Sequence, residues 1–165
     1  MTFFRRTAVP DVVKAVAVAA GERRIAWAAT PDGRAVVASS RALYLPDGTV
    51  LGWDEIERAH WEKPSLEIVE LTEREGSGRR HHVDLDLEHD TDLPETVRAR
   101  VSASVAWSSH VKLRPKGGVR IVGRRRVGME VLDWQLVFDR DTDPQDPGLR
   151  AQADEHLAAA RRTIG

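Results

Sequence analysis

The tripeptide Pro-Asp-Gly occurs twice in this chain, at residues 31–33 and again at 46–48. Proline presets φ at the first turn position, the aspartate side chain bonds the nearby backbone, and glycine accepts a positive φ. Valine, tyrosine, leucine and tryptophan flank the two turns, and these residues favour the pleated, half-buried surface of a strand. We therefore expect an antiparallel meander around the two turns.

Strands and three helices account for the rest of the chain. Asp and Pro mark the start of the expected helices, which lie near the N-terminus, at 93–105, and from 146 or 147 to 164. The expected strands are 23–29, 34–45, 49–62, 65–72, 80–87, 107–114, 118–126 and 129–138. Hairpin connections without βαβ alternation predict an α+β fold. We expect a mainly antiparallel, strongly bent sheet or partial barrel with an N-terminal, a middle and a C-terminal helix.

The length of the chain predicts one domain over 1–165. At 165 residues, folding buries roughly 70% of the unfolded surface, so no disulfide or metal is needed for stability. Within this domain we expect 22–106 to form the meander and the middle helix. Residues 107–165 then add a three-strand extension and the C-terminal helix.

The segment 41–59 carries a family resemblance. It reads Arg41-Ala-Leu-Tyr-Leu, then the second Pro-Asp-Gly turn, then Gly52-Trp-Asp-Glu-Ile-Glu-Arg-Ala. This order resembles the N-terminal meander of bacterial pleckstrin-homology-like (PH-like) and GRAM-like domains over about 23–72, and the whole chain resembles small actinobacterial proteins rich in Arg, Ala and Val. The resemblance implies seven strands capped by one helix, and a binding scaffold rather than an enzyme. It also implies phosphoinositide binding only where a basic loop pocket is present.

Composition excludes several classes of function. The chain has no cysteine, which excludes a disulfide framework, cysteine-ligated zinc and thiol catalysis. Its formal net charge of −1 predicts no general attraction to nucleic acid or anionic membranes. No segment reaches the roughly 20 apolar residues that span a bilayer. We expect a cytoplasmic protein without a cofactor.

The N-terminal segment has two interpretations. Two arginines followed by a Val- and Ala-rich run are compatible with a signal peptide. Lys14 interrupts that run, whereas Pro10, Asp11 and Gly21 have the positions of helix start and stop residues. We therefore favour an amphipathic helix, and a homodimer through one of the Ala-rich terminal helices is a further hypothesis.

A basic hairpin is the main candidate binding site. No acidic residue lies between His110 and Met129, and seven cations do: Lys112, Arg114, Lys116, Arg120, Arg124, Arg125 and Arg126. Their spacing predicts a positive face that suits phosphate groups. The alternative is a solvated surface whose arginines pair with the acidic segment 84–92. Nucleic acid is the second possible ligand, although Trp107 is the only ring nearby for stacking.

Other combinations of residues predict structure rather than chemistry. In 82–88, Val83, Leu85 and Leu87 alternate with His82, Asp84, Asp86 and Glu88, as expected of a strand with one buried face. Those four polar residues lie too far apart along a strand to converge on one ion, and His89 and Asp90 add no diagnostic spacing, so we expect no metal site.

Catalysis and a ligand cup are the remaining alternatives. Ser109 and His110 are adjacent on a strand and face opposite sides, which excludes a simple nucleophile–base pair. Trp27, Trp53 and Trp134 either pack in the core or line a ligand cup. The expectation is a non-enzymatic module that binds a protein or an anionic ligand, with a nucleic-acid-associated protein using 112–126 as the alternative.

Overall fold

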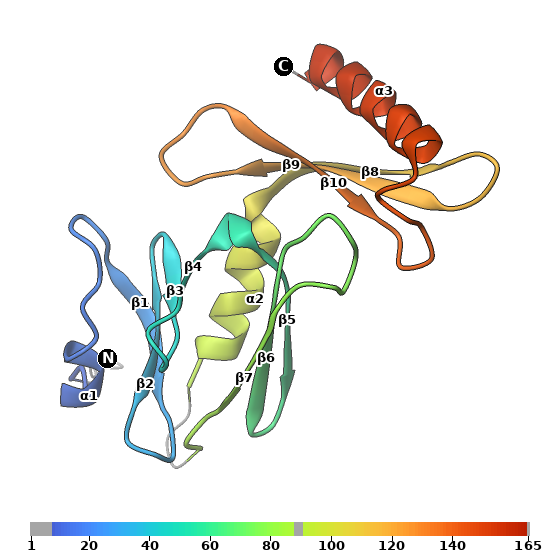
Figure 1. Ribbon diagram of the computed structural model, residues 1–165. Coiled ribbons are helices and arrows are strands. Elements are labelled where there is room, and N and C mark those ends of the chain that lie inside the picture. Colours follow the sequence, from blue (N-terminus) through green and yellow to red (C-terminus); the bar gives the residue numbers. More distant parts are fainter. Residues whose placement is uncertain (1–7, 88–90, 165) are drawn as a thin grey trace, which may run out of the picture.

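The computed structural model describes residues 8–87 and 91–164, and it has the expected α+β composition. The described helices are α1 (Asp11–Lys14), the 3-10 turn η1 (Trp53–Glu55), α2 (Leu93–Ser104) and α3 (Pro147–Ile164). All strand pairs within the sheets are antiparallel. Figure 1 shows the arrangement of these elements.

The first sheet confirms the predicted meander. It consists of β1 (Arg24–Ala29), β2 (Ala35–Ser39), β3 (Ala42–Tyr44) and β4 (Val50–Gly52), in that order. The two Pro-Asp-Gly turns connect β1 to β2 and β3 to β4. Gly33 and Gly48 close them at φ of 80° and 90°, the left-handed region that glycine accepts.

Two further sheets follow along the chain. The second contains β5 (Ile56–Glu62), β6 (Ser65–Glu70) and β7 (Arg80–Asp84), in the order β5-β6-β7. The third contains β8 (Val105–Lys112), β9 (Gly118–Arg125) and β10 (Leu132–Phe138), in the order β10-β9-β8. The described strands thus form three separate antiparallel sheets and no closed barrel.

Two expected strands are each divided in two. The strand expected at 34–45 breaks after Ser39, because the Ser39 hydroxyl accepts hydrogen bonds from the backbone N–H groups of Arg41 (3.1 Å) and Ala42 (2.9 Å) and holds a tight turn. The strand expected at 49–62 is interrupted by η1, where a bend was expected. Glu55 stabilises this turn by accepting a 2.7 Å hydrogen bond from the N–H of Gly52.

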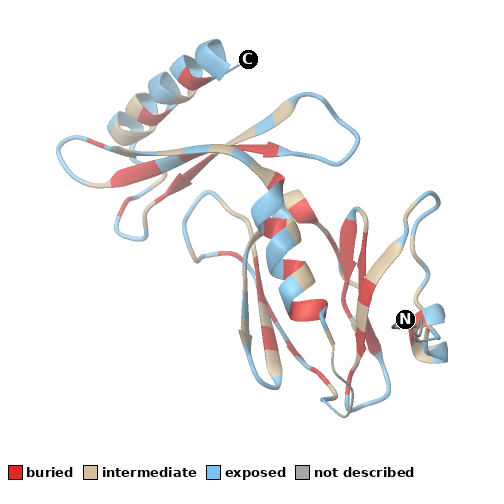
Figure 2. Ribbon diagram, turned by 180° about the vertical axis from the view of Figure 1, so that it is seen from behind, coloured by how far each residue is buried: buried red, intermediate tan, exposed pale blue. Residues whose placement is uncertain are grey.

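The main core lies between the first two sheets and α2. Its buried residues come from β1–β7 and from the apolar stripe of α2, where Leu93, Val97 and Val101 face inward. Figure 1 shows α2 beside both sheets, and Figure 2 shows that its other side is exposed. The spacing of these three residues is that of one helical face. The helix expected at 93–105 is confirmed, but it ends at Ser104 and Val105 begins β8.

A second core lies between the third sheet and α3. Val119, Ile121, Leu136 and Phe138 are its buried strand residues, and Ala153 and Ala160 are buried on the helix. Trp107 and Trp134 pack against the same cluster with ring centroids 5.5 Å apart, a tilted aromatic pair. Most of the α3 surface is exposed (Figure 2).

The N-terminal helix is shorter than the sequence predicts. It has a single turn, Asp11–Lys14, and residues 15–21 are not helical. Val16 and Val18 instead pack against a third cluster on the outer face of the first sheet. Arg24 fixes this extended course by donating a 2.7 Å hydrogen bond to the carbonyl of Val16. Beta-branched residues prefer such a backbone to a helix.

The loop between β6 and β7 links the two cores. The backbone carbonyl of Glu73 accepts a 2.7 Å hydrogen bond from the N–H of Phe138, and the backbone N–H of Glu75 donates a 2.9 Å hydrogen bond to the Phe138 carbonyl. Arg150 of α3 adds an ion pair with Glu73 at 3.0 Å. The loop therefore occupies the outer edge of β10 and holds the third sheet beside the second.

None of the described helices is long and apolar enough to cross a membrane.

Candidate functional site

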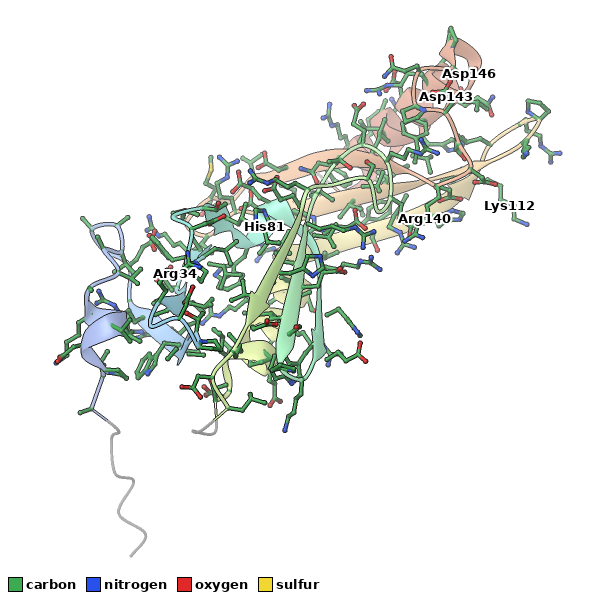
Figure 3. All side chains as sticks on the ribbon, turned by 60° about the horizontal axis from the view of Figure 1, so that its bottom comes forward. Arg34, His81, Lys112, Arg140, Asp143 and Asp146 are labelled. Carbon is green, nitrogen blue, oxygen red and sulfur yellow. The ribbon has the colours of Figure 1, made fainter. Side chains whose placement is uncertain are left out.

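A cavity of about 490 Å³ opens between the two Pro-Asp-Gly turns and strand β7. Its walls are the first turn (Thr30, Pro31, Asp32 and Arg34), the second turn (Leu45, Pro46 and Asp47) and the strand from Arg79 to Asp84. Figure 3 labels two residues that line it, Arg34 from the first turn and His81 from β7. The meander thus creates a cavity that the sequence analysis did not identify.

The first turn is held by a short ion pair. Arg34 lies 2.7 Å from Asp32, and the hydroxyl of Thr30 also donates to that carboxylate. Hydrogen bonds from Arg34 and then from Thr30 lower the pKa of Asp32 from 3.8 to about 2. Asp32 is therefore charged across the physiological range, and it neutralises the nearest arginine of the cavity.

The remaining charges of the cavity also balance. Arg79 and Arg80 line it together with Asp47 and Asp84. The pKa of Asp47 is lowered, chiefly because its carboxylate accepts a hydrogen bond from the N–H of Thr49. Three arginines thus meet three aspartates, and this cavity is not the basic loop pocket that phosphoinositide binding requires.

His81 is a fixed part of the cavity wall. Its side chain is buried, and Nε2 donates a 2.7 Å hydrogen bond to the carboxylate of Glu70. No serine or threonine hydroxyl among the described residues bonds to its ring. The pair holds β7 against β6 and supplies no nucleophile.

The seven cations of the basic hairpin have different environments. Six are exposed, and for five of these no ion pair is found among the described residues: Lys112, Arg114, Lys116, Arg120 and Arg125. The turn that carries Arg114 is anchored to α3, since Gln152 accepts from the Arg114 N–H (2.9 Å) and donates to its carbonyl (2.7 Å). The hairpin tip thus presents cations from a fixed backbone.

Arg124 and Arg126 have structural roles. Arg124 is only 4% exposed, and it donates a 2.8 Å hydrogen bond to the hydroxyl of Ser104. Arg126 lies 3.3 Å from Asp54 and 3.2 Å from Asp133. The two acids that pair with Arg126 lie outside the acidic segment 84–92 that the sequence analysis considered as a partner of the hairpin.

Lys112 and Arg120 share the sheet face opposite α3. Arg120 pairs across the strands with His110, and Lys112 lies two residues further along β8, so all three point to the same side. His110 is engaged by Asp139 at 2.9 Å. Figure 3 shows Arg140 along the same side of the sheet as Lys112, while Asp143 and Asp146 lie beside α3. We call Lys112, Arg120 and Arg140 the basic face.

Arg140 joins the basic face through the β6–β7 loop. The guanidinium of Arg140 lies against the backbone of Gly76 in this loop, because a Cβ atom at Gly76 would be only 2.9 Å from Arg140 Nη2. Arg140 is exposed, and the described residues include no carboxylate paired with it. The sequence analysis missed this residue because it lies in a loop distant from the hairpin in sequence, and only the pairing of β9 with β10 brings it there.

The acidic and histidine-rich segment forms no metal site in the described part of the chain. Its strand ends at Asp84 rather than at 87. Asp84 accepts a hydrogen bond from Ser65, and His82 lies 3.7 Å from Glu67. Leu87 is exposed, not buried as the alternation predicts. Glu88, His89 and Asp90 lie outside the described residues.

The Ser108–His110 segment has no catalytic arrangement. Val111 and Trp107 pack toward α3, so Ser109 between them points to that side and His110 to the other. Neither serine of the segment hydrogen bonds to His110 among the described residues. His110 and Asp139 thus form a partly exposed hydrogen-bonded pair, to which no serine of this segment is bonded among the described residues.

The three tryptophans considered for a ligand cup belong to three different clusters. Trp53 is buried in the main core, Trp134 packs against the α3 core, and Trp27 packs on the outer face of the first sheet. Trp53 donates its indole N–H to the Ser39 carbonyl at 3.1 Å. Each ring is therefore a packing residue, and the three form no common cup.

No protein-family model, curated protein or solved structure matches this chain.

Proposed function

We propose that the protein is a non-enzymatic binding module that holds an anionic, phosphate-bearing ligand on its basic face. The observation that carries this proposal is the exposure of Lys112, Arg120 and Arg140 on one side of the third sheet without a partner carboxylate among the described residues. Lysine and arginine form charge-assisted hydrogen bonds with phosphate oxygens, which are stronger than neutral ones.

The position of the basic face supports this proposal. The opposite face of the sheet is covered by α3, so a ligand meets only the side that carries the three cations. Arg114 and Lys116 extend the positive charge at the hairpin tip, and Gln152 anchors their turn. A preorganised site costs less ordering entropy when it binds.

The arrangement of the first two sheets supports a scaffold of the PH-like kind. A four-stranded sheet (β1–β4) is followed along the chain by a three-stranded sheet (β5–β7) and then by the helix α2. This is the element order that the family resemblance implies, with the third sheet as an added unit. In this proposal the added unit, rather than the turns of the meander, supplies the ligand site.

A titration with three anionic ligands tests the proposal. The probes are vesicles of phosphatidylcholine with and without phosphatidylserine, inositol hexakisphosphate, and a short DNA duplex. The test variant is K112S/R120S/R140S, and the control R98S/R161S/R162S removes the same charge from exposed positions elsewhere. We expect the test variant to lose about 100-fold in affinity for an anionic probe, because each cation contributes about 1 kcal/mol.

Equal losses in the two variants, or no binding by the unmodified protein to any probe, would overturn the proposal. The pattern among the probes identifies the source of the phosphate. Preference for the duplex, with a steep loss of affinity between about 50 and 200 mM salt, would instead identify a nucleic-acid-associated protein.

A further inference from the structure

Strand β7 uses only one of its two edges. It pairs with β6 and with no other strand of the described residues. The carbonyl of Arg79 accepts a 2.9 Å hydrogen bond from Glu70, and the N–H of Leu85 donates one of 2.9 Å to Pro64. The odd-numbered residues of this segment therefore carry the ladder to β6, as an antiparallel pair requires.

The even-numbered residues direct their backbone groups to the other side. Arg80, His82 and Asp84 have N–H and C=O groups that bond to no backbone group within the described residues. At the next even position, the backbone N–H of Asp86 donates a 2.9 Å hydrogen bond to the carbonyl of Ala29 at the end of β1. The outer edge of β7 is thus closed at Asp86 and open from Asp84 to Arg80.

The cavity of about 490 Å³ runs along this open edge. Its opposite wall contains Pro31, Leu45 and Pro46. Proline has no N–H to donate, so Pro31 and Pro46 offer apolar surface without competing for backbone hydrogen bonds, and the charged Asp32, Arg34 and Asp47 lie beside them. A strand inserted here would find its hydrogen-bond partners on β7 and its packing surface on the two turns.

The dimensions and charges define the occupant. Residues 80–84 extend for about 16 Å at roughly 3.3 Å per residue, which matches an extended segment of about five residues. The exposed side chain of Arg79 lines the cavity, where its charge acts on Asp47 from a distance, and it forms no ion pair within 4 Å with a described residue. It favours an acidic side chain at that end of the segment.

We propose that the open edge of β7 binds an extended peptide segment of a partner protein by strand addition. Main-chain hydrogen bonds to Arg80, His82 and Asp84 supply the affinity, and an acidic residue of the peptide beside Arg79 sets the orientation in which the peptide binds. Strand addition to an unpaired sheet edge is a general mode of peptide recognition. This site is separate from the basic face, so the two proposals stand or fall independently.

A selection from a phage-displayed library of random 12-residue peptides, with the full chain as bait, tests the inference. Enriched peptides are then synthesised and titrated against two variants. H82P removes the N–H that points into the cavity but spares the ladder to β6, because proline is tolerated at a sheet edge. H82A removes only the side chain and is the matched control.

We expect the selected peptides to carry an acidic residue at one end, to bind the unmodified protein and H82A equally, and to lose at least about tenfold in affinity with H82P. Methylation of the peptide nitrogens in one alternating register should abolish binding, and methylation in the other should not. Failure to enrich any peptide, or equal binding to H82P with an unchanged melting temperature, would overturn the inference. A dimer in sedimentation that H82P dissociates would assign the edge to a second copy of this chain instead.

Discussion

Nη1 of Arg124 donates a 2.8 Å hydrogen bond to the hydroxyl of Ser104 and thereby joins β9 to the last turn of α2. Both residues are buried. Burial lowers the pKa of Arg124, and the carboxylates of Asp54 and Glu57 raise it. Since an arginine keeps its charge in proteins, this contact is a desolvated cation held by one hydroxyl between the two cores.

Removal of that hydroxyl should destabilise the protein. S104A leaves a buried guanidinium without its partner, and the expected loss is about 1–3 kcal/mol in the free energy of unfolding. S102A is the control, because Ser102 is exposed on the same helix. Urea denaturation of both variants measures the difference. A loss in S104A no larger than that in S102A would mean that the contact contributes nothing to stability.

Asp32 should titrate well below an ordinary aspartate. Hydrogen bonds from Arg34 and Thr30 lower its pKa from 3.8 to about 2. The contribution of the pair to stability is therefore complete above pH 3.8 and is lost as the pH falls toward about 2. NMR titration of the carboxyl carbon measures this value, and R34Q should move it back toward 3.8. An unmodified protein in which Asp32 titrates near 3.8 would contradict the ion pair.

Two glycine positions should differ in their tolerance of alanine. Gly117 and Gly33 both have positive φ, 102° and 80°, so each substitution strains the backbone by about 1–2 kcal/mol. A methyl group at Gly117 also collides with the side chain of Thr142, whereas a methyl group at Gly33 has no described atom within 4 Å. G117A should therefore be the less stable variant by roughly 1–3 kcal/mol. Equal melting temperatures of G117A and G33A would show that the Thr142 loop moves aside without cost.

Local signals account for the parts of the fold that the sequence predicted. The two Pro-Asp-Gly turns and the helix α2 depend on residues close together in the chain, and both were predicted, the helix to within one residue at its end. The break after Ser39 was not, because the side-chain hydrogen bonds that make it do not alter the hydrophobic period. The N-terminal helix was predicted to be too long, because Val16 and Val18 pack against the first sheet in an extended backbone and the local sequence pattern does not reveal this contact.

The candidate site shows the same limit. Strand parity placed Lys112 and Arg120 on a positive hairpin, and the register with His110 puts both on one face. It did not reveal the burial of Arg124, which depends on a contact with Ser104 in a different element. The cavity beside β7 was missed for a related reason, since its walls are turns and an edge that meet only in three dimensions.

The most direct test of the proposed function is a map of backbone amide chemical shifts during titration with inositol hexakisphosphate. We expect the largest changes at Lys112–Arg120 and around Arg140, and none in β1–β4. The same titration of K112S/R120S/R140S should produce no saturable change. Shifts concentrated at Arg34 and Arg79, or no shifts at the basic face of the unmodified protein, would contradict the assignment of the ligand site to this face.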